Sequence, residues 1–249
     1  MSSADTVRVA AITLTFLIAG AVKGVTGMGL PTVAMGVLGA LMLPAEAASL
    51  LILPSFITNV WQLLAGPRLG ALVRRLWSMM AGIVIGTVAA ASFIAGSGGR
   101  WAVTGLGAAL TLYAASGLLS WGFSVPARHE RRLSPVIGVV TGLVTGGTGV
   151  FVIPAVPYLQ ALDLKKEDLV QALGLSFTVS TVALAIGLAR ASAFTTADLT
   201  SSLLAVAPAL CGMWIGQHVR GHISSVTFRR WFFICMLALG LQLLLRHLI

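Results

Sequence analysis

Long apolar runs separated by short polar gaps dominate this sequence. Several runs approach the roughly 20 apolar residues that an α-helix needs to cross a bilayer, and they lie at 47–66, 76–96, 101–123, 169–189, 199–215 and 231–245. The gaps carry arginines, which cluster around 68–75, 128–132 and 220–230. This pattern predicts an all-α polytopic membrane protein.

Two further apolar regions, 9–43 and 136–162, are interrupted by glycine and proline. The first contains KGVTGMGLP at 23–31, and the second contains TGGTG at 145–149, followed by Pro154 and Pro157. Because glycine and proline interrupt helices, we predict that each region is a glycine-broken helical hairpin or a re-entrant segment.

The order of one broken region followed by three helices occurs twice, which indicates an internal repeat of 1–125 and 126–249. Matching residues recur in the same order in the two halves. The pairs are Gly20 and Gly24 with Gly142 and Gly146, Gly27 and Gly29 with Gly147 and Gly149, Glu46 with Glu167, Ser55 with Ser176, Asn59 with Ser180, Gly82 and Gly86 with Gly212 and Gly216, and Arg100 with Arg230.

The arginine-bearing gaps bear on orientation, because cytoplasmic loops carry an excess of lysine and arginine. If each broken region returns to the side it entered, all three gaps can face the cytoplasm. The repeats are then inverted, with both termini outside. If each broken region crosses fully, the halves are parallel and the gap at 220–230 lies outside. Charge favours the inverted arrangement in a cell inner membrane, although Arg100 and Arg190 then fall outside.

Composition supports a membrane location and excludes several function classes. The chain is 57% hydrophobic and 9% charged, whereas soluble domains carry about 25% charged residues. The net charge of +9 resides mostly in the gaps, so nucleic acid is not an expected partner. Cys211 and Cys235 lie in apolar runs without metal-ligand spacing, and we expect no metal and no cofactor.

The two breaks also predict a site. Irregular backbone within a bilayer is tolerated only where protein or a water-filled cavity satisfies its polar groups. Helix N-termini directed into such a cavity favour an anion. The alternative is that the glycines only permit close helix packing. We favour packing for Gly82, Gly86, Gly212 and Gly216, and a site for the glycines of the breaks.

Lys23 lies about 21 Å along the first apolar run from its start, at 1.5 Å per helical residue. An ionisable residue at such depth is a candidate functional group, although it could instead extend its side chain to an interface. Hydroxyls and amides on the helices that follow the breaks could coordinate an oxyanion. The alternative is that they only form hydrogen bonds between helices. The predicted substrate-binding residues are Lys23, Thr26, Gly27, Gly29, Ser55, Asn59, Gln62, Thr145, Gly147, Thr148, Gly149, Ser176 and Ser180.

The acidic residues fall at the ends of the apolar runs, and no nucleotide-binding or catalytic motif is present. An enzyme and an ATP-driven pump are therefore not expected.

The broken segment GVTGMGLP at 24–31, its partner GGTGVFVIP at 146–154 and the duplicated layout resemble the sulfite exporter TauE/SafE family, also called the toluenesulfonate uptake permease family. The resemblance covers nearly the whole chain. It implies a transporter of about eight membrane segments that handles sulfite, sulfonates or related organosulfur acids.

We therefore expect a secondary transporter of a small sulfur-containing anion in the lipid bilayer. The alternative is a non-transporting membrane scaffold or assembly subunit, which has no need for irregular backbone at depth. A coupling ion, either a proton or sodium, and a homodimer both stay open.

Overall fold

The computed structural model describes residues 3–96, 99–119, 124–193, 196–222 and 224–246. Within these ranges the chain forms only α-helices, and seven of them are long and apolar enough to cross a membrane. The prediction of an all-α, multi-pass membrane protein is confirmed. The helices are α1 (Ser3–Thr26), α2 (Leu30–Leu41), α3 (Pro44–Leu64), α4 (Leu69–Ala95), α5 (Gly99–Leu119), α6 (Ala127–Thr148), α7 (Ala155–Gln160), α8 (Lys166–Arg190), α9 (Thr196–Val219) and α10 (Ser225–Leu245).

Several helices extend beyond the predicted apolar runs. α4 begins at Leu69 and so includes Arg74 and Arg75, which the pattern placed in a connection. α10 begins before Arg229 and Arg230 in the same way. The predicted boundaries were wrong here because arginine is a good helix former, and a helix continues after it leaves the lipid. The last residues of the run at 101–123 lie outside the described ranges.

Both predicted glycine breaks are present. α1 ends at Thr26 and α2 begins at Leu30, and the intervening Gly27 and Gly29 have φ angles of 78° and 102°. α6 ends at Thr148, and the next residue, Gly149, has a φ angle of 73°. Side-chain-bearing residues rarely adopt such angles, so glycine allows each long helix to end at this point.

Thr26 and Thr148, the last residues of α1 and α6, share two local hydrogen bonds, and Thr26 has a further one to Met28 O at 2.6 Å. Each hydroxyl donates to the carbonyl oxygen four residues earlier, at 2.9 Å for Thr26 and 2.7 Å for Thr148. Each also accepts from the backbone N–H two residues later, at 3.2 Å in both cases. Gly27 therefore corresponds to Gly149, whereas the sequence pattern paired it with Gly147.

The first broken region begins and ends on the same side of the bundle. Arg8 near the start of α1 forms an ion pair with Glu46 near the start of α3. Lys23 near the end of α1 contacts Asn59 toward the end of α3. α1 and α3 therefore run in the same direction, and the short α2 between them runs back.

The second broken region behaves in the same way. α4 is parallel to α6 and also parallel to α8, so α6 and α8 share a direction and the chain between them returns. The contacts that fix these directions are Arg75–Glu130 and Ala90–Gly146 between α4 and α6, and Arg68–Asp168 and Ala91–Gly187 between α4 and α8.

The two halves of the chain run in opposite senses. Asn59 contacts Thr181, while Gln62, further along α3, contacts Val170, which is earlier on α8. α3 and α8 are therefore antiparallel, and so are α1 and α6. This geometry excludes the arrangement in which both broken regions cross fully and the halves run parallel. The descent of the halves from one duplicated unit stays a prediction.

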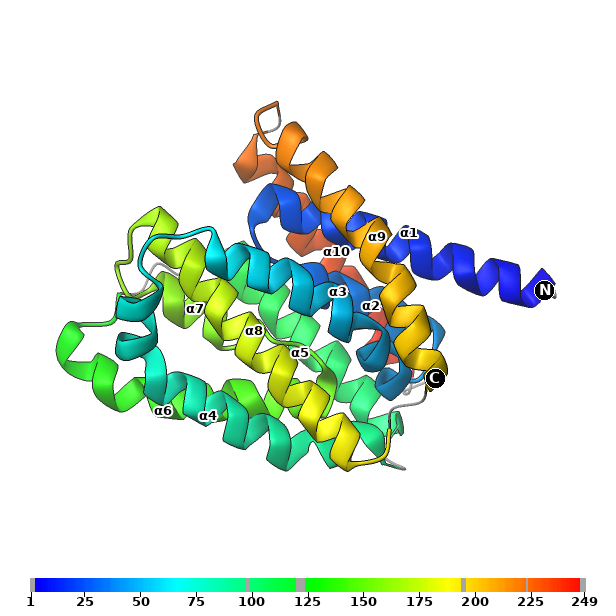
Figure 1. Ribbon diagram of the computed structural model, residues 1–249, viewed down its shortest axis with the longest axis horizontal. Coiled ribbons are helices and arrows are strands. Elements are labelled where there is room, and N and C mark those ends of the chain that lie inside the picture. Colours follow the sequence, from blue (N-terminus) through cyan, green and yellow to red (C-terminus); the bar gives the residue numbers. More distant parts are fainter. Residues whose placement is uncertain (1–2, 97–98, 120–123, 194–195, 223, 247–249) are drawn as a thin grey trace.

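One end of the bundle, which we call the arginine-rich end, collects most of the basic residues. α3 ends there, and α4, α6, α8 and α10 begin there, whereas α1 begins and α10 ends at the opposite end (Figure 1). α9 also ends there, because its contacts with α1 show the two helices to be parallel. The basic residues of this end are Arg68, Arg74, Arg75, Arg128, Arg131, Arg132, Lys165, Lys166, Arg220, Arg229 and Arg230.

Glycines bring α1 close to α9 and α4 close to α6. A methyl group added at Gly24 or Gly216 would meet backbone atoms across the α1–α9 contact, and one at Gly82 or Gly146 would do so between α4 and α6. Each first helix is thus packed against a helix of the other half. The close-packing interpretation is confirmed for Gly82, Gly86, Gly212 and Gly216.

Candidate functional site

The side chain of Lys23 is buried within the bundle and is only 3% exposed. Its Nζ donates to Thr58 Oγ1 at 3.2 Å and to Asn59 Oδ1, both on α3. The alternative that Lys23 extends to an interface is therefore wrong. Thr58 lies beside the predicted residue Asn59 and was not among the predicted site residues.

Lys23 has no carboxylate partner within the described part of the chain. The ion pairs found there are Arg8–Glu46, Arg68–Asp168 and Arg75–Glu130. A buried charge is strongly unfavourable unless it is paired and hydrogen-bonded. When protonated, the Lys23 amine therefore lacks a counter-charge among the described residues.

The hydrogen-bond network continues from α3 to the opposite half of the chain. Asn59 Nδ2 donates to Thr181 Oγ1 on α8 at 3.4 Å. On the same two helices, the hydroxyl oxygens of Ser55, Ser176 and Ser180 are buried and have no hydrogen-bond partner. Buried polar groups are nearly always satisfied, so the unpartnered hydroxyls on the two helices that carry this network are candidate ligand contacts.

Pro54 shapes α3 immediately before Ser55. Proline has no N–H, so it cannot bond the carbonyl oxygen four residues earlier, which belongs to Leu50. Ser202 on α9 replaces that bond, because its Oγ donates to Leu50 O at 2.8 Å. The only sequence signal for this contact was Pro54 within an apolar run, and it did not identify the partner.

Gln62 lies nearer the arginine-rich end and joins α3 to α8. Its Nε2 donates to Val170 O at 2.9 Å, whereas its Oε1 has no partner. Gln171, which the sequence did not single out, donates to Leu63 O at 2.8 Å and to Gly66 O at 2.7 Å. The side-chain amides of Gln62 on α3 and Gln171 on α8 thus both join the end of α3 to α8.

The predicted residues of the second break are not joined to Lys23 by any described hydrogen bond. Thr145 donates to the carbonyl oxygens of Thr141 at 2.8 Å and Val150 at 3.3 Å, and so holds the shape of its own break. Gly147 lies in the last turn of α6, where an added methyl group would make only an ordinary contact with Phe93.

Both breaks contact α2. Gly29 immediately precedes this helix. A methyl group added at Gly149 would collide with Met35, which lies on α2 six residues after Gly29. That separation is about 9 Å along a helix at 1.5 Å per residue. A common site for the glycines of both breaks stays a prediction.

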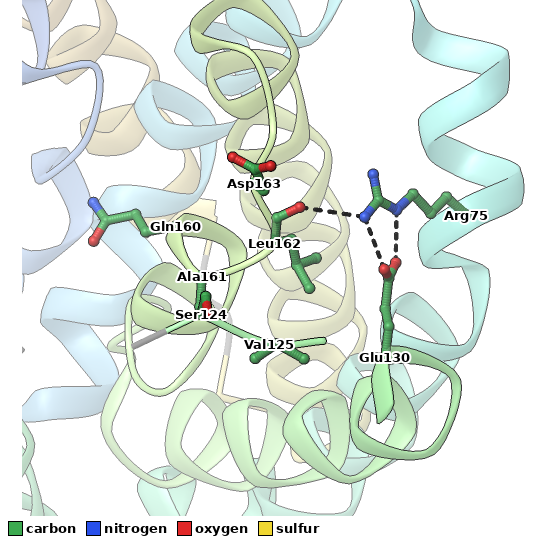
Figure 2. A pocket seen from close by; sticks show the side chains of 8 residues that line it. All are labelled: Arg75, Ser124, Val125, Glu130, Gln160, Ala161, Leu162 and Asp163. Carbon is green, nitrogen blue, oxygen red and sulfur yellow. Dashed lines mark hydrogen bonds and ion pairs between the residues drawn. The ribbon is translucent and has the colours of Figure 1, made fainter. Parts of the chain in front are cut away.

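A separate cavity of about 690 Å³ opens at the arginine-rich end. Figure 2 shows Arg75 between the carboxylate of Glu130 and the carbonyl oxygen of Leu162. Glu130 already neutralises Arg75, with both hydrogen bonds at 2.7 Å, and Asp163 adds a further negative charge. This cavity is therefore poorly suited to an anion, and we place the candidate substrate site at Lys23.

The geometry matches a transporter in having a buried polar centre reached by helices from both halves. Neither the comparison with curated proteins nor the comparison with solved structures gives a match. Residues 12–243 match the model of the family described as sulfite exporter TauE/SafE, so this chain belongs to that family of membrane transporters.

Proposed function

We propose that this protein is a secondary transporter that carries a small sulfur-containing oxyanion, sulfite or a sulfonate, through the Lys23 site. The observation that carries the proposal is the buried Lys23 side chain, whose Nζ has only neutral partners among the described residues. The family supports the substrate class, because its description names sulfite.

The chemistry of the site suits a sulfur oxyanion. Sulfite and sulfonates present three oxygens and a negative charge, and they require hydrogen-bond donors around them. Lys23 supplies a charge-assisted donor. Ser55, Ser176 and Ser180 supply hydroxyls that are not already committed within the protein. Hydroxyls can donate to oxyanions without adding further charge.

Access to the site requires movement. Lys23, Asn59 and the three serines are all buried, so the described state is closed around them. Inverted-repeat transporters open by rocking one group of helices against another around a fixed site. We propose that 1–125 and 126–249 are such repeats and that α1–α9 and α4–α6 move as close-packed pairs.

We further propose that the protein resides in a cell inner membrane with the arginine-rich end in the cytoplasm. This orientation follows the excess of lysine and arginine in cytoplasmic loops. Both termini then lie outside.

The binding experiment uses purified protein in detergent, titrated calorimetrically with sulfite, methanesulfonate and, for comparison, acetate. We expect sulfite or methanesulfonate to bind and the Lys23→Ala variant to lose at least tenfold in affinity. Lys166→Ala, which removes an exposed lysine of the arginine-rich end, is the matched control and keeps wild-type affinity.

Folding of each variant is checked by gel filtration and thermal unfolding. Ser180→Ala provides a milder second variant, which removes a hydroxyl that holds no partner in the protein. Absence of sulfur-oxyanion binding to the wild type would remove the proposed function. Equal affinity in Lys23→Ala and wild type would remove the site.

A further inference from the structure

The two hydrogen bonds of Lys23 Nζ have a fixed direction, because both of its neutral neighbours can only accept. The Thr58 hydroxyl donates its proton to Pro54 O at 2.7 Å, so its oxygen is free to accept from Lys23. The Asn59 amide nitrogen donates to Thr181, which leaves Oδ1 to accept. Both neighbours therefore take an N–H from Lys23 rather than giving one.

Two acceptors match the two N–H groups of a neutral amine. An ammonium group has three donors and a full positive charge. The third N–H and the charge have no protein partner among the described residues. A bound anion supplies both the missing acceptor and the missing counter-charge.

Charged or titratable side chains on the surrounding helices do not supply that counter-charge, since they are exposed, paired or bonded elsewhere. The described ones are Glu46 on α3, paired with Arg8; Tyr113 on α5, which donates to Met28 Sδ; Asp168 on α8, paired with Arg68; the exposed Lys166, Glu167 and Arg190 on α8; the exposed Cys211 and His218 on α9; and the exposed Arg229, Arg230 and Cys235 on α10. The sequence of α2 contains no ionisable residue.

We infer that Lys23 is also the proton-coupling group, so that each monovalent anion crosses together with one proton carried on Nζ. The inference rests on the proposed function and adds the identity of the coupling ion. When the anion enters, the Nζ lone pair takes a proton from water to form the ammonium. When the anion leaves, the same N–H bond breaks and the proton returns to water. Because binding free energies are reciprocal, anion binding favours protonation as much as protonation favours anion binding.

The first test measures protons taken up on binding, and it needs neither transport nor a variant. Methanesulfonate is the probe, because it is the anion of a strong acid and carries no proton itself. Binding to the purified protein is titrated calorimetrically in buffers of different ionisation enthalpy, over a pH series that spans neutrality. We expect net uptake that approaches one proton per bound anion at the alkaline end of the series. Binding with no uptake at any pH would overturn the inference and leave the proposed function standing.

The second test follows transport in liposomes loaded with a pH-sensitive dye. An imposed methanesulfonate gradient should move protons in the direction of the anion, with one proton per anion and no build-up of membrane potential. Lys23→Arg is the decisive variant, because a guanidinium cannot be deprotonated in a protein. We expect any anion flux through it to lose its accompanying protons and to depend on membrane potential.

Lys166→Arg makes the same chemical change at an exposed site and should keep wild-type coupling. Proton movement that persists unchanged in Lys23→Arg would assign coupling to another group. If Lys23→Arg no longer binds the anion, the proton uptake measured calorimetrically on the wild type decides whether binding is coupled to protonation. Failure of the wild type to bind methanesulfonate or sulfite would instead count against the proposed function itself.

Discussion

Lys23 on α1 and Asn59 on α3 are joined by a hydrogen bond between Nζ and Oδ1. The other end of the Asn59 amide reaches Thr181, so this side chain connects the first half of the chain to the second. We therefore expect anion binding at Lys23 to depend on a residue that also contacts α8.

Replacing Asn59 with aspartate changes charge with little change in shape. A carboxylate at this position would pair with Lys23 and compete with the substrate for its charge. We expect Asn59→Asp to weaken sulfite or methanesulfonate binding by at least tenfold, or about 1.4 kcal/mol. Calorimetric titration measures the loss, and thermal unfolding shows whether the protein stays folded. Unchanged affinity in a folded variant would place the anion away from Nζ.

Gly149 and Gly147 provide a matched test of the second break. Gly149→Ala forces a side chain into a left-handed conformation, which costs about 1–2 kcal/mol, and its methyl group would also collide with Met35. We expect the melting temperature of Gly149→Ala in detergent to be lower than that of the wild type. Tryptophan fluorescence during heating measures it. Gly147→Ala has ordinary contacts only and should not be less stable than the wild type. The reverse order would show that the break lies at Gly147.

The contact between Ser202 and the carbonyl oxygen of Leu50 predicts a conditional effect. Ser202→Ala leaves a buried carbonyl without a partner, which costs about 1–3 kcal/mol. Pro54→Ala supplies a backbone N–H that can bond the same oxygen. We therefore expect Ser202→Ala to lower the melting temperature less in the Pro54→Ala background than in the wild type. Additive losses in the double-mutant cycle would contradict this account of Ser202.

Single cysteines at exposed connections test the proposed orientation. Cys211 and Cys235 are first replaced by serine. Asp163→Cys then reports on the arginine-rich end, and Ser192→Cys reports on the opposite end. In intact cells, a membrane-impermeant thiol reagent should label Ser192→Cys but not Asp163→Cys. The opposite labelling would reverse the orientation without affecting the Lys23 site.

Local signals in the sequence located the breaks well. Glycine and proline act on their own segment of backbone, and both breaks were predicted close to where they occur. The register of the second break differs from the sequence pairing because TGGTG contains two threonine–glycine pairs, and either of them can be aligned with Thr26 and Gly27. The pattern does not show that the left-handed conformation belongs to Gly149.

Partners distant in sequence could not be predicted in this way. The spacing along one helix identified Ser55 and Asn59, because such residues share a face. The bond from Ser202 to Leu50 spans 152 positions, and the amide of Gln171 reaches Gly66 across 105. Those pairings depend on how α3, α8 and α9 meet, which no local pattern encodes.

The opposed directions of the helices have an electrical consequence. Among the long helices, α1, α3, α5 and α9 run toward the arginine-rich end, and α4, α6, α8 and α10 run away from it. Each helix carries a dipole equivalent to about half an elementary charge at either end. Four dipoles therefore oppose four others, and the bundle as a whole offers the transmembrane field little to act on. In the proposed mechanism the anion and the proton on Lys23 cross together and their charges cancel, so we expect wild-type transport to depend little on membrane potential.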